Sequence, residues 1–75
     1  MKNLTRKEAE VIVRQVIADH TRLKPEEQKD DINLTADQIH SMALFCAIRL
    51  ESPVVSVFSD NLGQFVDRTL SAYRD

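Results

Sequence analysis

The chain has 75 residues, of which 43% are apolar and 29% are charged, and its formal net charge is −2 at pH 7. This balance excludes a disordered chain and corresponds to one domain, residues 1–75, near the lower size limit for a stable core. The acidic balance argues against nucleic acid as a partner, and the longest apolar run, residues 42–48, is too short to span a membrane. Because the first ten residues lack the apolar run of a signal peptide and Cys46 is the only cysteine, we expect a cytoplasmic protein without disulfides or a cysteine-rich metal site.

The first predicted helix carries the clearest local signals in the chain. Thr5 and Glu8 form a capping box, in which the threonine hydroxyl accepts from the Glu8 amide and the Glu8 carboxylate reaches back. Apolar residues then recur at spacings of three and four, namely Ala9, Ile12, Val13, Val16 and Ile17. This pattern predicts a helix from about Arg6 to His20 with one buried face.

The connector that follows is polar, with Leu23 and Ile32 as its expected inward anchors. Pro25 and the two glutamates after it are suited to a single helical turn, because proline fits the first helical position and acids favour the positive end of the helix dipole. Asp30 and Asp31 lack the alternating ligands, central glycine and terminal glutamate of a calcium-binding loop. We therefore predict no metal site.

A second capping box, formed by Thr35 and Gln38, predicts a helix from Ala36 to about Glu51. One apolar stripe on this helix consists of Ile39, Ala43, Cys46 and Leu50, with Met42 at its edge. A second stripe, on the far side, consists of Leu44, Phe45 and Ile48. A helix that is apolar on both sides is either central in a bundle or covered by a partner. The predicted partner-binding residues are Met42, Leu44, Phe45 and Ile48.

The last segment begins with Ser52 and Pro53, which are typical of a helix start. An apolar stripe follows, made of Val54, Phe58, Leu62, Phe65, Val66, Leu70 and Tyr73. Gly63 weakens a helix by roughly 1 kcal/mol relative to alanine. Residues 53–73 are therefore predicted as either one long helix or a short and a longer helix with a break near Ser59, Asp60 and Asn61. Taken together, the pattern predicts an all-α bundle of three or four helices.

Residues that could act chemically do not form a recognisable catalytic set. His40 and Ser41 are adjacent, so on a helix they do not face each other, and no third group is evident to orient the histidine. His20 is expected in the last turn of the first helix, where its charged form suits the dipole. Cys46 is expected to be a small buried apolar residue. We predict no catalytic residues and no enzymatic activity.

The segment NLTADQIHSM, residues 33–42, resembles the phosphopantetheine attachment motif of acyl and peptidyl carrier proteins. In one alignment, the stretch from Ile39 to Met42 matches the end of the Gly-Gly-(His or Asp)-Ser-Leu core, so that Ser41 is the modified serine and His40 flanks it. The segment from Pro53 to Phe58 is similar to the stretch that leads into the last helices of a carrier. This resemblance implies a carrier-like bundle that docks on biosynthetic enzymes and holds phosphopantetheine on Ser41.

A second alignment sets Asp37, Gln38 and Ile39 against the Asp-Ser-Leu of the carriers. It agrees with the capping box at Thr35, but it places a glutamine at the attachment position. In this register the chain is shaped like a carrier and carries nothing. The alternative function is then a non-enzymatic interaction module, such as an inhibitor or adaptor of a regulated target or a homodimer. The two alignments differ in where the middle helix begins.

Overall fold

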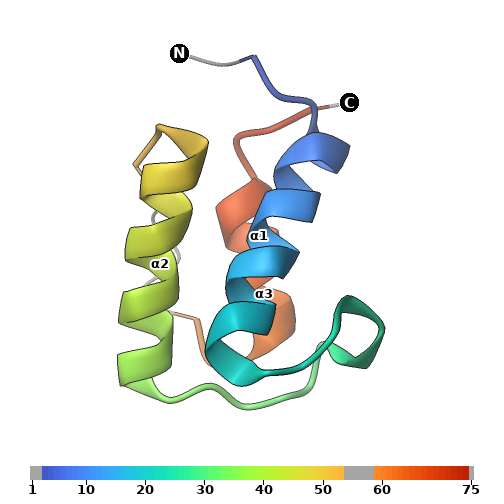
Figure 1. Cartoon of the computed structure of the whole chain (residues 1–75), viewed down its shortest axis with the longest axis vertical. Helices are drawn as coiled ribbons and strands as arrows, with labels where there is room; N and C mark the ends of the chain where they lie inside the picture. The colour runs from blue at the N-terminus through green and yellow to red at the C-terminus, as the bar shows by residue number, and fades with distance from the viewer. Residues whose placement is uncertain (1–2, 54–58, 75) are drawn as a thin grey trace.

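A computed structural model of the protein describes residues 3–53 and 59–74, which form three α-helices and one 3₁₀ turn (Figure 1). In chain order these are α1 (Arg6–Thr21), η1 (Pro25–Glu27), α2 (Ala36–Leu50) and α3 (Leu62–Leu70). The described residues contain no β-strand, only an isolated bridge between Asn33 and Asn61. The all-α prediction is confirmed.

Helix α1 begins where its capping box predicts. The Glu8 amide donates to the Thr5 hydroxyl at 3.1 Å, and the Thr5 amide donates to the Glu8 carboxylate at 2.9 Å. The helix ends at Thr21 and is followed by Arg22, whose backbone is left-handed with φ 64° and whose amide donates to the Ala18 carbonyl. Sequence and structure therefore agree on α1 to within one residue.

Helix α2 begins at Ala36, because its first turn is closed by the second capping box. The Gln38 amide donates to the Thr35 hydroxyl at 3.1 Å, and the Thr35 amide donates to the Gln38 side-chain oxygen at 3.0 Å. The helix ends at Leu50, and the left-handed Glu51 follows with φ 55°. A helix start at Ser41, which the first carrier alignment requires, is therefore wrong.

Helix α3 begins at Leu62, after Asn61, whose side-chain oxygen accepts from the Gln64 amide at 2.8 Å. The end of the connector lies against this helix start, where the Gly63 amide donates to the Asp30 carbonyl at 3.0 Å. A Cβ on Gly63 would lie 2.8 Å from the Asp30 Cβ and 3.1 Å from its Cα, so glycine permits this close approach. The residues that bear on a helix before α3, 54–58, lie outside the described part of the chain.

Helix α1 runs antiparallel to α2 and packs against both α2 and α3 (Figure 1). The three helices bury one continuous apolar core, made of Ala9, Val13, Val16, Ile17, Ile39, Met42, Ala43, Cys46, Leu50, Leu62, Phe65, Val66 and Leu70. Met42 is completely buried in it, so the prediction that Met42 contacts a partner is wrong. In the described residues, no helix is both long enough and apolar enough to cross a bilayer.

Candidate functional site

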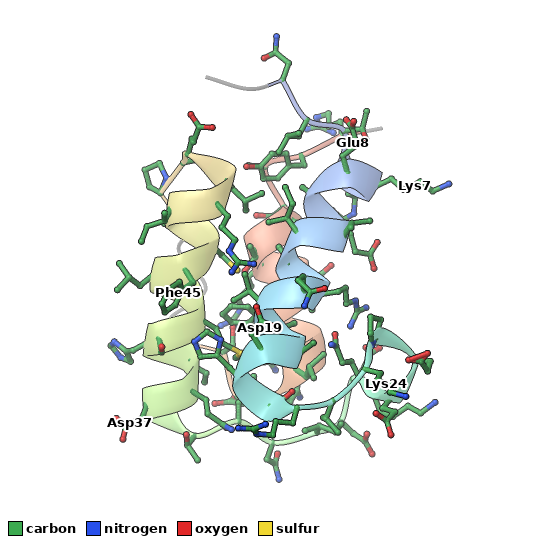
Figure 2. The ribbon with its side chains drawn as sticks, in the orientation of Figure 1. Lys7, Glu8, Asp19, Lys24, Asp37 and Phe45 are labelled. Carbon is green, nitrogen blue, oxygen red and sulfur yellow. The ribbon has the colours of Figure 1, made fainter. Side chains whose placement is uncertain are left out.

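Helix α2 exposes three large apolar side chains on the face that turns away from the core. Leu44, Phe45 and Ile48 are 60%, 41% and 61% exposed, and their spacing places them on one side of the helix. We call these three residues the α2 crest; Phe45 is labelled on α2 in Figure 2. The structure thus brings together three of the four predicted contact residues, since Met42 points into the core.

Polar residues surround the α2 crest. Asp37 and His40 are exposed in the first turns of the helix. Further along, Arg49 forms an ion pair with Asp19 of α1 at 3.5 Å, with both side chains close to half exposed. The crest is therefore an apolar strip with a polar rim, which is the usual composition of a protein-contact surface.

Ser41 is the sixth residue of α2, and its side chain turns towards α1. Its oxygen lies 2.9 Å from Nε2 of His20, a residue 21 positions earlier in the chain. The other ring nitrogen, Nδ1, lies 2.8 Å from the Val16 carbonyl oxygen. Because a carbonyl can only accept, Nδ1 carries a proton, and in the neutral ring Nε2 accepts from the Ser41 hydroxyl.

The imidazole of His20 also packs against Phe45, with ring centroids 5.2 Å apart and an interplanar angle of 58°. Ser41, His20 and Phe45 therefore form one cluster, the His20 cluster, which joins the end of α1 to the middle of α2. Sequence reasoning rejected the neighbouring His40 as a base for Ser41 and did not pair Ser41 with His20; His40 is exposed. Only the antiparallel packing of the two helices brings His20 to Ser41.

The position of Ser41 does not fit a phosphopantetheine attachment site. A serine at a helix start is exposed, and the free amides and positive dipole end there favour an incoming phosphodiester. Here the free end of α2 lies at Ala36 and is capped by Thr35, whereas Ser41 is partly buried and bonded to His20. The second alignment places Gln38 at the attachment position, and Gln38 has no hydroxyl.

Cys46 lies in the core and is not available for chemistry. Burial raises the pKa of its thiol from 9.0 to about 12, and the nearby positive charge of Arg49 lowers it only in part. Thiols react as thiolates, so this cysteine is inert in the folded protein at neutral pH. Within residues 3–53 and 59–74, no cluster of three His, Cys, Asp or Glu side chains is placed to hold a metal ion.

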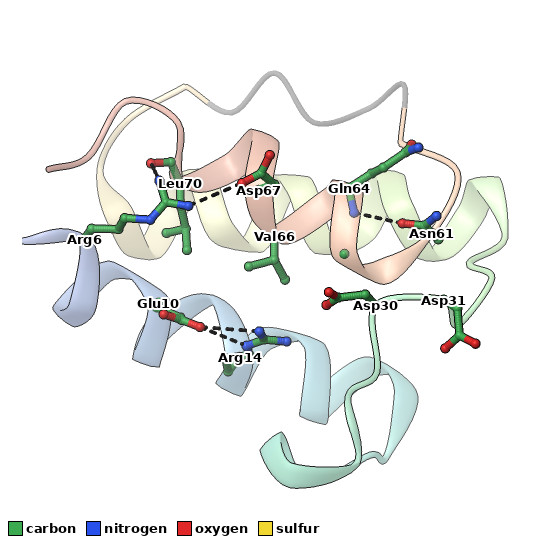
Figure 3. Close-up of a pocket in the computed structure, with 11 residues that line it drawn as sticks. Arg6, Glu10, Arg14, Asp30, Asp31, Asn61, Gln64, Val66, Asp67 and Leu70 are labelled. Carbon is green, nitrogen blue, oxygen red and sulfur yellow. Dashed lines mark hydrogen bonds and ion pairs between the residues drawn. The ribbon is translucent and has the colours of Figure 1, made fainter.

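A second surface feature is an open polar groove of about 590 Å³ between α1, α3 and the connector (Figure 3). Arg6 donates to the Leu70 carbonyl and to Asp67, and Arg14 pairs with Glu10 on its own helix. Both arginines are therefore already occupied within the bundle. The groove therefore offers no free guanidinium group to a ligand.

Neither a family model, nor a curated protein, nor a solved structure matches the chain.

Proposed function

We propose that the chain is a non-enzymatic protein-interaction module that docks on a protein partner through the α2 crest and carries no prosthetic group. The observation that carries this proposal is the exposure of Leu44, Phe45 and Ile48 together on a helix whose opposite face forms the core. Exposed apolar side chains that gather on one face, with polar residues around them, are typical of contact surfaces.

The size of the α2 crest sets the kind of complex that it supports. Complete burial of one Leu, Ile or Phe side chain contributes about 1.5–3 kcal/mol, and roughly half of each crest side chain is still exposed, so docking gains about 2–5 kcal/mol. Association itself costs at least about 4 kcal/mol. The partner must therefore also contact the polar rim, where Asp37 and His40 are exposed, and the complex is transient.

The carrier function is less well supported, because it needs an exposed hydroxyl at the start of α2. Incubation with coenzyme A and a broad-specificity phosphopantetheinyl transferase, followed by intact-mass measurement, tests it directly. We expect no adduct on this chain in a reaction that fully modifies a known carrier protein. An adduct that disappears in Ser41→Ala would restore the carrier function and overturn this part of the proposal.

The docking face is tested with a matched pair of charge substitutions. Ile48 and Val11 are both strongly exposed β-branched residues, at 61% and 69%, but Val11 lies on the outer face of α1. We expect Ile48→Glu to abolish crosslinking of the tagged protein to a partner in an extract of its own cells, and Val11→Glu to leave it intact. Both variants should keep the helical circular dichroism of the wild type.

Two results would contradict the docking face. One is equal crosslinking by wild type and Ile48→Glu; the other is equal loss in both variants. Sedimentation of the purified protein shows whether the α2 crest binds a different protein or a second copy of this chain. A homodimer through the α2 crest would become a monomer in Ile48→Glu but not in Val11→Glu.

A further inference from the structure

Two members of the His20 cluster, together with the Val16 carbonyl, provide the three parts of an activated nucleophile, and the docking function uses none of this hydroxyl chemistry. Ser41 supplies the hydroxyl, His20 Nε2 lies 2.9 Å away as the base, and the Val16 carbonyl holds the other ring nitrogen at 2.8 Å. A nucleophile, a base in hydrogen-bond reach and a third group that orients the base form the recurrent arrangement of nucleophilic serines. We propose that His20 activates Ser41 to accept one acyl group from activated esters.

The orientation of the imidazole matters as much as the distance. Because the Val16 carbonyl fixes the proton on Nδ1, the lone pair of Nε2 points at the Ser41 hydroxyl, which is the tautomer that a general base requires. Phe45 packs against the ring and limits its rotation. The orientation of the His20 imidazole is therefore fixed by two groups, the Val16 carbonyl and the Phe45 ring.

The α2 crest indicates the class of ester. Leu44 and Phe45 follow Ser41 by three and four residues, so they lie next to it on the helix surface. The Leu44 side chain is 60% exposed and the Phe45 side chain is 41% exposed. An apolar acyl chain can lie on this strip while its carbonyl carbon reaches the Ser41 oxygen, so longer acyl chains should react faster than acetyl.

The chemical step transfers an acyl group from an aryl ester to the serine. The Ser41 oxygen forms a bond to the carbonyl carbon as its proton moves to His20 Nε2, and the bond from that carbon to the aryl oxygen then breaks. The aryl oxide leaves with the bonding pair, and the proton on Nε2 passes to solvent. The products are O-acyl-Ser41 and the phenolate, so no further reactant is needed.

The same geometry limits the reaction to a single event. General base catalysis supplies about 10²–10⁴-fold, but each missing oxyanion donor forfeits about 10²–10³-fold. The amides around Ser41 lie inside the regular helix α2 and are bonded within it, so they do not offer such donors. Attack therefore succeeds only on esters with a good leaving group, and hydrolysis of the acyl-serine is slow.

The experiment treats the folded protein with p-nitrophenyl acetate and with p-nitrophenyl hexanoate, and measures phenolate release and intact mass. We expect one equivalent of phenolate, one acyl group per chain and a faster reaction with the hexanoate. Trypsin should release the segment between Lys29 and Arg49, in which Ser41 is the only serine, and this peptide should carry the acyl group. Ser41→Ala should lose the adduct, and His20→Gln should slow it by about 10²-fold.

Two controls separate activation from ordinary reactivity. His40→Gln should react like the wild type, because His40 is exposed and outside the cluster. The urea-unfolded wild-type chain should acylate Ser41 as slowly as His20→Gln, and this comparison does not require any variant to fold. Acylation of Ser41 at equal rates in the folded and unfolded chains, or acyl groups found only on lysines, would overturn the proposal.

Discussion

At the residue scale, the chemistry of the chain is decided by which side chains the core encloses. Cys46 and Met42 are fully buried one turn apart on α2, whereas Leu44, Phe45 and Ile48 on the same helix are exposed. The apolar pattern of α2 has two stripes, and periodicity cannot tell which of them meets the other helices. This is why Met42, at the edge of its stripe, was predicted to contact a partner and instead lies in the core.

Because Cys46 is buried, the free energy of unfolding should fall as the pH rises through the alkaline range. The thiol titrates at 9.0 when it is free of the fold and at about 12 in the folded protein. Between these pH values the unfolded chain has released a proton that the folded chain retains, so stability falls by about 1.4 kcal/mol per pH unit. Below the unfolded pKa this contribution is fully present and constant.

Urea unfolding of wild type and Cys46→Ala at neutral pH and at about pH 10.5 measures this effect. The alanine variant leaves a small cavity and is less stable at neutral pH, but it should lose less stability on the rise in pH. Parallel losses in the two proteins would show that the Cys46 thiol does not cause the alkaline destabilisation.

Gly63 is the residue whose role differs most from its sequence signal. Its weak helix propensity favours a break near residues 59–61, and α3 does begin just after them, at Leu62. The sequence does not indicate the close packing at Gly63 itself, where an added Cβ would lie only 2.8 Å from the Asp30 Cβ. We expect Gly63→Ala to destabilise the protein by about 1–3 kcal/mol through overpacking, despite the roughly 1 kcal/mol gain in helix propensity. Urea denaturation gives the sign, and a more stable Gly63→Ala would contradict the close approach.

The double variant Gly63→Ala with Asp30→Gly provides the control. It removes the Asp30 side chain from the contact, so part of the lost stability should return. A double-variant loss equal to the sum of the two single losses would mean that the residues do not interact.

At the element scale, helix starts are readable from sequence and helix contacts are not. Both capping boxes join residues three positions apart, so Thr5 and Thr35 mark the first turns whatever the rest of the chain does. The bond between His20 and Ser41 spans 21 positions and depends on the packing of α1 against α2. No local pattern in the sequence indicates this contact.

Helix ends offer a test of backbone strain. Arg22 ends α1 in a left-handed conformation, which costs an L-residue roughly 1 kcal/mol that glycine avoids. We therefore expect Arg22→Gly to raise the free energy of unfolding by up to about 1 kcal/mol. The matched variant Ala18→Gly, inside the same helix, should lower it by about the same amount. Thermal unfolding measures both, and a loss of stability in Arg22→Gly would contradict the left-handed end.

At the scale of the whole molecule, Arg6 joins the first turn of α1 to the last turn of α3. Its guanidinium donates to the Leu70 carbonyl at 3.0 Å and to Asp67 at 3.4 Å, and its amide donates to the Arg74 carbonyl at 3.2 Å. Exposed ion pairs contribute about 0.2–1 kcal/mol. The part-buried bond to Leu70 combines a hydrogen bond, of about 0.5–1.5 kcal/mol, with a cation at a helix C-terminus, of about 0.3–1 kcal/mol. The bond to Leu70 should therefore matter at least as much as the pair with Asp67.

Substitution of each partner separates the two contributions. We expect Arg6→Gln to lower the free energy of unfolding by about 1 kcal/mol and Asp67→Asn by only a few tenths. The effect of Asp67→Asn should vanish in high salt, because the Asp67 side chain is 81% exposed. Equal losses from the two substitutions would assign the whole effect to the ion pair.

The hydrogen bond between Arg6 and Arg74 means that this bundle can be circularly permuted. The backbones of Arg6 and Arg74 are hydrogen-bonded to each other, so a short glycine linker could join the two ends of the described chain. The new N- and C-termini could then be placed in the exposed connector at Glu26. Such a circular permutant should keep all three helices and their core. The same proximity would let the bundle be inserted as a cassette into a surface loop of a larger host protein, with the α2 crest still displayed.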